Sequence, residues 1–295
     1  RKEFVKRVKH MAEDGRVAVR NARRDGRKEL EALEKAGHIS SDELSRAEKE
    51  LDKLKDDFMA TVSHEIRTPL TSIRSFSEIL RDNPELDTEQ RQEFVTIIVQ
   101  ESERLSRLIN DILDLAKMEA GTTDWQIAEH QPAPIIEQAL AATSGLIAKA
   151  DHIRLEVDIA PDLPTFRVDE DRLIQVIVNL VSNAVKFCDK KHGLIQVRAW
   201  QEGGHVQVAV ADNGIGIAPA DQGKIFERFQ QAGNTLTDKP QGTGLGLPIS
   251  RQILQRFGGE ISVESNLGDG AIFTFRIPVA RVAEPAGAAA LEPAR

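Results

Sequence analysis

The 295-residue chain is poor in the features that mark secreted, membrane and nucleic-acid-coating proteins. Its one cysteine, Cys188, cannot form a disulfide within the chain, which is typical of a reducing compartment. No apolar run approaches the ~18 residues that a membrane span needs, and no signal peptide is recognisable. A formal net charge of −8 disfavours a general nucleic-acid coat and DNA as a partner. We therefore expect a cytoplasmic protein with no membrane segment.

Aromatic residues are also scarce, at 4% of the chain against 40% for hydrophobic residues as a whole. This balance predicts aliphatic cores and many helices, and the length allows two or three domains. The chain starts at Arg1 rather than Met, so we expect a cut or fused polypeptide. Residues 281–295, rich in Ala, Pro and Glu, are expected to be a disordered tail.

The N-terminal third has the apolar spacing of long amphipathic helices. A first helix is predicted over residues 2–36, ending at Gly37, with Ser41 or Asp42 capping the second. The second is predicted from about residue 42 to 80, kinked near Pro69.

A third helix follows the turn at residues 83–84, with Asp87 or Thr88 as its cap and Gly121 as its stop. The second and third helices carry heptad-like apolar seams and cannot bury both faces alone. We therefore expect a homodimer in which two antiparallel hairpins form a four-helix bundle.

After Gly121 the apolar residues alternate in the manner of β-strands, with helical stretches between them. Strands are predicted near residues 153–159, 194–200, 206–210, 261–263 and 272–277, and helices near 134–149, 170–187 and 245–257. The fold class is therefore an α-helical region followed by a two-layer α/β domain whose sheet is covered by helices.

His64 is the clearest candidate for a chemically reactive residue in the helical region. If Val62 and Ile66 are seam positions, His64 points away from the partner helix. Glu65 is adjacent, and Thr68 lies about 40° round the helix from His64. A carboxylate next to an imidazole can take its proton or fix its tautomer, which prepares the ring to attack phosphorus. A helical zinc protease motif is excluded because Thr68 stands where the second histidine is needed.

Two asparagines, Asn179 and Asn183, stand one turn apart on an otherwise apolar helix that continues into Lys186 and Phe187. Buried amides need several hydrogen-bond partners, so this arrangement is costly without a ligand. Amide oxygens suit Mg²⁺, and a lysine can neutralise phosphate.

Two glycine-rich segments complete the candidate site. The first, DNGIGI, places Asp212 after a strand, where Gly214 and Gly216 allow close backbone approach and the carboxylate can accept a hydrogen bond from an exocyclic amine. The second precedes a helix, where free amides bind anions, and comprises Gly242, Thr243, Gly244, Leu245 and Gly246.

The polar stretch 230–241 between these segments has the composition of a lid. Arg228, in IFERF just before it, could reach a terminal phosphate.

In this order and spacing, HEIRTPL, DRLIQVIVNLVSNAVKF, DNGIGI, IFERF and GTGLGL resemble the H, N, G1, F and G2 boxes of two-component sensor histidine kinases. The resemblance implies a dimerisation and histidine-phosphotransfer domain at 56–121 and a Bergerat-type catalytic ATP-binding domain at 122–280. It also implies ATP and Mg²⁺ as cofactors and a response-regulator receiver domain as partner, with possible phosphatase activity toward it.

Matched residue by residue, the resemblance makes His64 the phosphoacceptor and Glu65 its acid/base neighbour. It assigns the remaining roles as follows: Thr68 positions water during dephosphorylation, Asn179 and Asn183 hold Mg²⁺, Lys186 binds phosphates, Phe187 lies against the nucleotide, and Asp212 reads adenine. Related ATPases carry a general-base Glu one turn before the metal-binding Asn, where this chain has Asn179, so hydrolysis is expected to be slow.

Residues 1–55 resemble a different family, the helical hairpin of ribosome recycling factor, through VRNARRD and the ISSDEL turn. The third helix and β domain of that family are missing, so the resemblance implies its hairpin fold and not its activity. We expect a fusion in which this hairpin replaces a sensory region. Two alternatives stay open: an inactive kinase scaffold, and an RNA-binding fusion through the basic residues 1–30.

Overall fold

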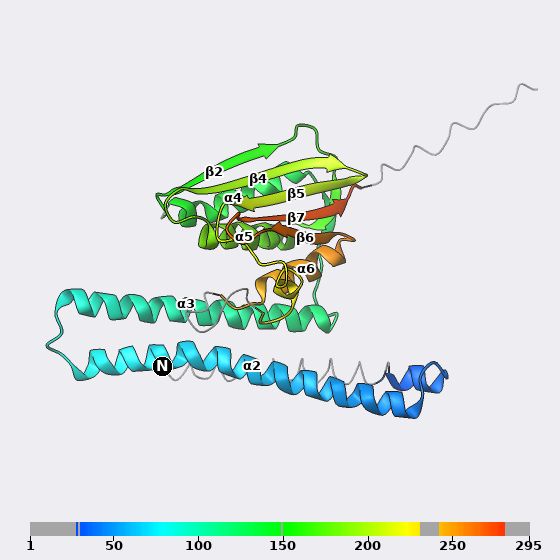
Figure 1. The fold of residues 1–295 in the computed structure, drawn as a ribbon, viewed down its shortest axis with the longest axis horizontal. Helices are drawn as coiled ribbons and strands as arrows, with labels where there is room; N and C mark the ends of the chain where they lie inside the picture. Colours follow the sequence, from blue (N-terminus) through cyan, green and yellow to red (C-terminus); the bar gives the residue numbers. More distant parts are fainter. Residues whose placement is uncertain (1–27, 29, 149, 231–241, 281–295) are drawn as a thin grey trace, which may run out of the picture. The chain divides into compact units, whose positions relative to one another are not determined.

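The computed structural model describes residues 28, 30–148, 150–230 and 242–280 (Figure 1). The chain divides into two compact units. The helical unit comprises Arg1–Asp124 with Gly223–Ile249, and the sheet unit comprises Trp125–Gln222 with Ser250–Arg295. Most of the predicted first helix, most of the basic stretch 1–30, all but the first residue of the predicted lid 230–241, and the tail 281–295 lie outside the described residues.

Helix α2, Ser41–Asp82, is a single helix of 42 residues that runs through Pro69. Its N-cap is Ser40, which corrects the expectation of Ser41 or Asp42. The Ser40 hydroxyl accepts from the Glu43 amide at 3.3 Å, and Glu43 Oε2 accepts from the Ser40 amide at 2.8 Å. This reciprocal pair satisfies two backbone donors at once, which makes Ser40 the better cap.

Helix α3, Thr88–Glu119, runs antiparallel to α2 (Figure 1). Asp87 caps it by accepting from the Gln90 amide, and the helix ends just before Gly121, as predicted. The two helices pack through an apolar seam in which the rings of Phe76 and Phe94 lie 5.3 Å apart between centroids. The seam on α3 is buried at Leu105, Leu108 and Leu115.

The sheet unit contains a five-stranded sheet in the order β2-β4-β5-β7-β6. Only β2 and β4 are parallel; the other neighbours are antiparallel. The strands are β2 Ile153–Ile159, β4 Gly193–Glu202, β5 His205–Asp212, β6 Glu260–Ser265 and β7 Ala271–Pro278. All five coincide with the predicted alternating segments: β2 matches its segment at both ends, and the other four extend one or two residues beyond theirs.

Helices α4, Pro132–Ala148, and α5, Glu170–Phe187, pack together against the sheet, which confirms the two-layer prediction (Figure 1). Side chains of α5 such as Leu173, Ile177 and Leu180 are at most 1% exposed. They form the core with inward-facing sheet residues such as Val197 and Phe275. Helix α6, Gly246–Arg256, follows the second glycine-rich segment.

A second sheet was not predicted. Strand β1, Ile127–His130, pairs antiparallel with β3, Phe166–Asp169. Each has four residues, which is too short to show alternation in the sequence. None of the described helices has the length and apolarity of a membrane span.

The loop after β5 is fixed by close backbone packing at Gly216. This residue has φ +68°, and an added Cβ would lie 1.9 Å from the carbonyl oxygen of Asn266. The Gly268 amide donates to the Ile215 carbonyl at 2.8 Å, which ties the loop to the turn after β6. Only glycine fits this crossing without moving one of the two backbones.

We expect Gly216→Ala to lower the free energy of unfolding by about 2 kcal/mol or more, because it combines left-handed strain with a backbone clash. Gly145→Ala is the matched control, since an added Cβ on this α4 residue meets nothing within 4 Å. That change should raise stability by up to about 1 kcal/mol through helix propensity. Chemical denaturation of both variants measures the difference, and equal stabilities would contradict the crossing.

Candidate functional site

His64 lies near the middle of α2 with its side chain 75% exposed, so the predicted outward orientation is confirmed. Its Nδ1 is 3.8 Å from Oε1 of Glu65, whose own side chain is 22% exposed. One ring nitrogen therefore faces a carboxylate, and the other, Nε2, is separated from it by one ring carbon. This is the arrangement of a nucleophilic imidazole with a neighbouring acid/base group.

Thr68 follows one turn later on α2. Its hydroxyl donates to the backbone carbonyl of His64 at 3.2 Å. Having given its hydrogen to the carbonyl, the hydroxyl oxygen keeps its acceptor lone pairs. The bond therefore ties the Thr68 hydroxyl to the backbone of His64 and leaves its oxygen able to accept a hydrogen bond.

Arg104 of α3 is a member of this group that the sequence did not reveal. Its Nη2 lies 3.5 Å from Oε2 of Glu65, and its Nη1 lies 3.9 Å from Oε2 of Glu101 on the same helix. Arg104 directly precedes Leu105, a buried seam residue of α3, and charged residues flanking a seam often form pairs between helices. Its position next to a seam residue was the one feature of the sequence that could have pointed to Arg104, but that position does not identify Glu65 as the partner.

The second glycine-rich segment contacts α3 within the helical unit. Thr243 Oγ1 donates to Oδ2 of Asp111 at 2.8 Å and accepts from the Leu245 amide at 3.3 Å. Arg104 Nη2 also donates to the Gly242 carbonyl at 3.5 Å. Burial raises the pKa of the Asp111 carboxyl, while its bond to Thr243 works in the other direction.

The same segment is braced by Phe229, whose amide donates to the carbonyl of Gly244 at 2.9 Å. An added Cβ on Gly244 would meet the Phe229 backbone at 2.8 Å. The ring of Phe229 packs against that of Phe58 in a tilted arrangement, with centroids 5.4 Å apart. Next to it, Arg228 forms an ion pair with Glu119, so its partner here is a carboxylate at the end of α3.

In the sheet unit the two predicted asparagines lie on the second half of α5. The Asn179 side-chain NH₂ donates to the hydroxyl of Ser250 at 3.0 Å, and Ser250 is 1% exposed. This bond fixes which way the Asn179 amide points, with its oxygen on the branch away from Ser250. Asn183 follows one turn later on the same face. Two amide oxygens one helical turn apart, that of Asn179 oriented by its bond to Ser250, fit a hard divalent cation such as Mg²⁺.

The end of α5 is held against the loop after β5. The Ile215 amide donates to the Phe187 carbonyl at 3.3 Å, and an added Cβ on Gly214 would lie 2.0 Å from that same carbonyl oxygen. The Phe187 side chain remains 40% exposed, with Lys186 Nζ 4.3 Å from its ring centroid. The structure thus brings Lys186 and Phe187 beside the DNGIGI loop.

Asp212 ends β5 and stands at the base of this loop. Its Oδ1 accepts from the Gly214 amide at 2.9 Å. Burial raises the pKa of the Asp212 carboxyl above its usual value, and hydrogen bonds from the Gly214 and Ala271 amides offset part of that rise. The result is a fixed, partly buried acceptor suited to one specific donor.

Three family models match the chain. Residues 168–281 match the histidine kinase-, DNA gyrase B- and HSP90-like ATPase family, and residues 54–121 match the His Kinase A (phospho-acceptor) domain. Residues 1–73 match ribosome recycling factor. The first two matches contain all of the candidate residues described above.

Similar proteins include several sensor kinases. The chain is 34% identical to the circadian input-output histidine kinase CikA of Synechococcus elongatus, over 94% of this chain and 38% of the relative. It is 40% identical to drug sensory protein A of Synechocystis, over 79% of this chain and 36% of the relative. It is 39% identical to sensor protein TorS of Escherichia coli, over 86% of this chain and 28% of the relative. The chain thus spans between 28% and 38% of the length of these relatives.

Two solved structures share the fold. One is the histidine kinase ThkA in complex with the response regulator protein TrrA, with 28% identity, a TM-score of 0.63, and coverage of 81% of this chain and 66% of that one. The other is full-length ShkA in complex with AMPPNP, with 33% identity, a TM-score of 0.55, and coverage of 76% and 46%. The chain belongs to the family of two-component sensor histidine kinases.

Proposed function

We propose that this chain is an ATP-dependent protein histidine kinase that phosphorylates its own His64 and passes the phosphoryl group to an aspartate of a response regulator. The observation that carries the proposal is the pairing of His64 Nδ1 with the Glu65 carboxylate at 3.8 Å on an exposed helix face. The carboxylate favours the tautomer with its proton on Nδ1. Nε2 then keeps its lone pair and serves as the nucleophile.

In the transfer step a bond forms between Nε2 and the γ-phosphorus of ATP. The bond from that phosphorus to the β,γ-bridging oxygen breaks, and ADP leaves with the electron pair. The ring becomes positively charged as Nε2 gives up its lone pair, and Glu65 stabilises that charge by accepting from Nδ1. Phosphoryl transfer depends mainly on this kind of positioning and charge neutralisation.

The nucleotide residues of the sheet unit have complementary roles in this proposal. Asp212 accepts a hydrogen bond from the exocyclic amine of adenine, and the exposed ring of Phe187 lies against the nucleotide. Lys186 binds phosphate, and the amide oxygens of Asn179 and Asn183 hold Mg²⁺. When bound, Mg²⁺ supplies neutralisation of the phosphate charge.

The glycine-rich segment 242–246 offers backbone amides at the start of α6 to the phosphates. Arg228 is suited to a terminal phosphate once it leaves Glu119. Slow hydrolysis is supported by Asn179, because its amide is bonded to Ser250 and has no group that can take a proton from water. The phosphoryl group is therefore kept for transfer rather than lost to solvent.

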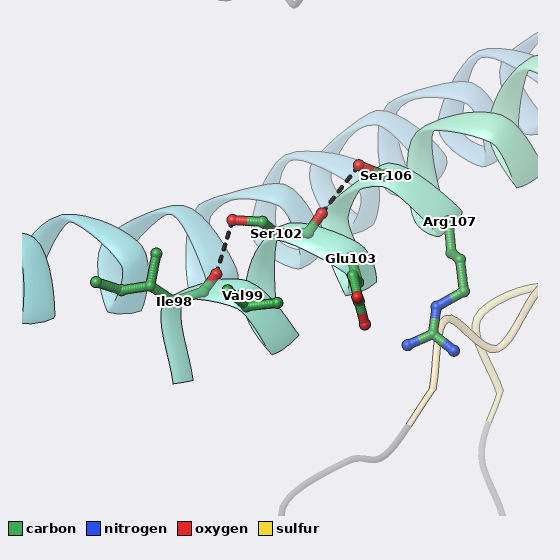
Figure 2. Close-up of a pocket in the computed structure, with 6 residues that line it drawn as sticks. All are labelled: Ile98, Val99, Ser102, Glu103, Ser106 and Arg107. Atoms are coloured by element: carbon green, nitrogen blue, oxygen red, sulfur yellow. Dashed lines mark hydrogen bonds between the residues drawn. The ribbon is translucent and has the colours of Figure 1, made fainter. Parts of the chain in front are cut away.

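A homodimer is part of this proposal. Helix α3 presents an open groove of about 530 Å³, shown in Figure 2. It is lined by Ile98, Val99, Ser102, Glu103, Ser106 and Arg107. Val95 and Val99 are 40% and 49% exposed on this helix. A second hairpin seated on this face would bury them and complete a four-helix bundle. The structure of ThkA with its response regulator supports a response regulator as the second partner.

The kinase assignment predicts that radiolabelled ATP gives an acid-labile, base-stable label that His64→Gln abolishes, because glutamine has no nucleophilic nitrogen. His152→Gln, a change at an exposed histidine of the sheet unit, is the matched control and should label like the wild type. Equal labelling of the His64→Gln variant would contradict the assignment, whatever its nucleotide affinity.

The role of Asp212 predicts that Asp212→Asn weakens ATP binding about tenfold or more, the loss expected for a hydrogen bond to a charged group. Stability should not fall, because asparagine can still accept from the Gly214 amide and carries no buried charge. Calorimetric titration and thermal melting separate the two effects. Asp158→Asn, an exposed position on β2, is the control and should change neither quantity appreciably.

The raised pKa of Asp212 adds a pH dependence with a definite sign. Only the ionised carboxylate is a full acceptor, so ATP affinity should fall as pH drops, beginning at a higher pH than for an ordinary aspartate. The Asp212→Asn variant should lose this part of the pH dependence. An identical pH profile in the two proteins would rule out Asp212 as the titrating group.

Phosphatase activity toward the response regulator is assigned to the Thr68 hydroxyl, which can accept from a water molecule. Thr68→Ala should slow dephosphorylation of the partner about tenfold while His64 labelling persists, and Thr68→Ser should restore it. Release of phosphate from the phosphorylated regulator measures both. Equal rates for the alanine and serine variants would show that the hydroxyl takes no part.

A further inference from the structure

We propose that Arg104 is a positioning residue for phosphoryl transfer: from α3 it holds the Glu65 carboxylate in the orientation that keeps the proton on Nδ1 of His64. This inference rests on the proposed kinase function. It assigns to α3 a direct part in preparing the nucleophile on α2.

The two oxygens of Glu65 divide between two partners. Oε2 lies 3.5 Å from Arg104 Nη2, and Oε1 lies 3.8 Å from His64 Nδ1. A carboxylate held at one oxygen by a guanidinium loses the freedom to rotate away from the imidazole at the other. Arg104, Glu65 and His64 thus form a chain in which one group orients the next, the arrangement that activates nucleophiles elsewhere.

The surroundings make this contact more effective than a surface ion pair. The side chains of Arg104 and Glu65 are each 22% exposed, whereas His64 is 75% exposed. Charges shielded from water interact more strongly, and a half-buried Glu65 without Arg104 would be left as an uncompensated charge. Arg104 and Glu65, which orient the imidazole, are therefore shielded from solvent, whereas His64, which reacts, is accessible to a nucleotide.

The fork of an arginine suits this place better than a lysine. Nη2 serves Glu65 and the Gly242 carbonyl, while Nη1 faces Glu101 at 3.9 Å. Glu101 thus holds the guanidinium from a second side and limits its rotation. A lysine would supply a charge at one point without this two-sided hold.

The test compares Arg104→Gln, Arg104→Lys and the control Arg74→Gln in the whole chain. Arg74 pairs with Glu78 on the exposed surface of α2, so its replacement removes an arginine and a surface ion pair that do not contact His64 or Glu65. Three quantities are measured: the rate of His64 labelling at saturating ATP, the affinity for ATP, and the imidazole ¹⁵N shifts of His64, which report the tautomer.

Arg104→Gln should lower the saturated labelling rate about 10- to 100-fold, as loss of an orienting partner typically does. ATP affinity should fall far less than the rate, because Arg104 reaches the phosphate-binding segment only through its 3.5 Å contact with the Gly242 carbonyl. The fraction of His64 protonated on Nδ1 should also fall. Arg104→Lys should recover part of the rate and of the tautomer signal. Arg74→Gln should match the wild type in all three.

An unchanged tautomer in both Arg104 variants overturns the proposal, as does a saturated labelling rate that stays at the wild-type value while only the affinity for ATP falls. If Arg104→Gln fails to fold, the tautomer and rate of Arg104→Lys decide. The tautomer measurement needs no ATP, so it tests Arg104 even if the wild type were never labelled. A wild-type protein that is never labelled would refute the proposed kinase function and not the role of Arg104.

Discussion

The apolar packing of α2 against α3 sets the register of the hairpin, and the polar contacts between the two helices depend on that register. Phe76 and Phe94 meet across the seam. Glu65 lies eleven residues before Phe76, and Arg104 lies ten residues after Phe94, so both contacts belong to one antiparallel register. A slip of one residue would turn Arg104 by ~100° around α3 and away from Glu65. The series of polar contacts from Arg104 through Glu65 to His64 is therefore a consequence of aliphatic and aromatic packing.

The sequence predicted those elements whose signal repeats along the chain. The spacing of apolar residues located α2, α3 and the five strands of the main sheet, because each element is long enough to show its period several times. Strands β1 and β3 have only four residues each and escaped the same reasoning. The cap of α2 was misplaced by one or two residues, because Ser40, Ser41 and Asp42 are all good caps by type. Only the reciprocal bond with Glu43 distinguishes Ser40.

The candidate residues were predictable by their chemistry, whereas their partners were not. His64 and Asp212 stand out in the sequence through neighbours close to them in the chain. By contrast, Arg104 is 39 residues from Glu65, and Ser250 is 71 residues from Asn179. Such contacts depend on helix register and on the packing of α6 residues against α5, which no local pattern encodes. The groups that bear the chemistry are thus local in sequence, and the groups that orient them are distant.

A common physical device links the imidazole of the helical unit and the carboxylate of the sheet unit. In each case one side of a functional side chain is available to a ligand, and polar contacts that are partly shielded from solvent restrain the other side. His64 is oriented through Glu65, and Asp212 through the Gly214 amide. Burial of Asp212 raises its pKa and so costs stability when it is ionised. A buried, restrained acceptor gains selectivity in return, because a ligand without the matching donor would leave that acceptor unpaired.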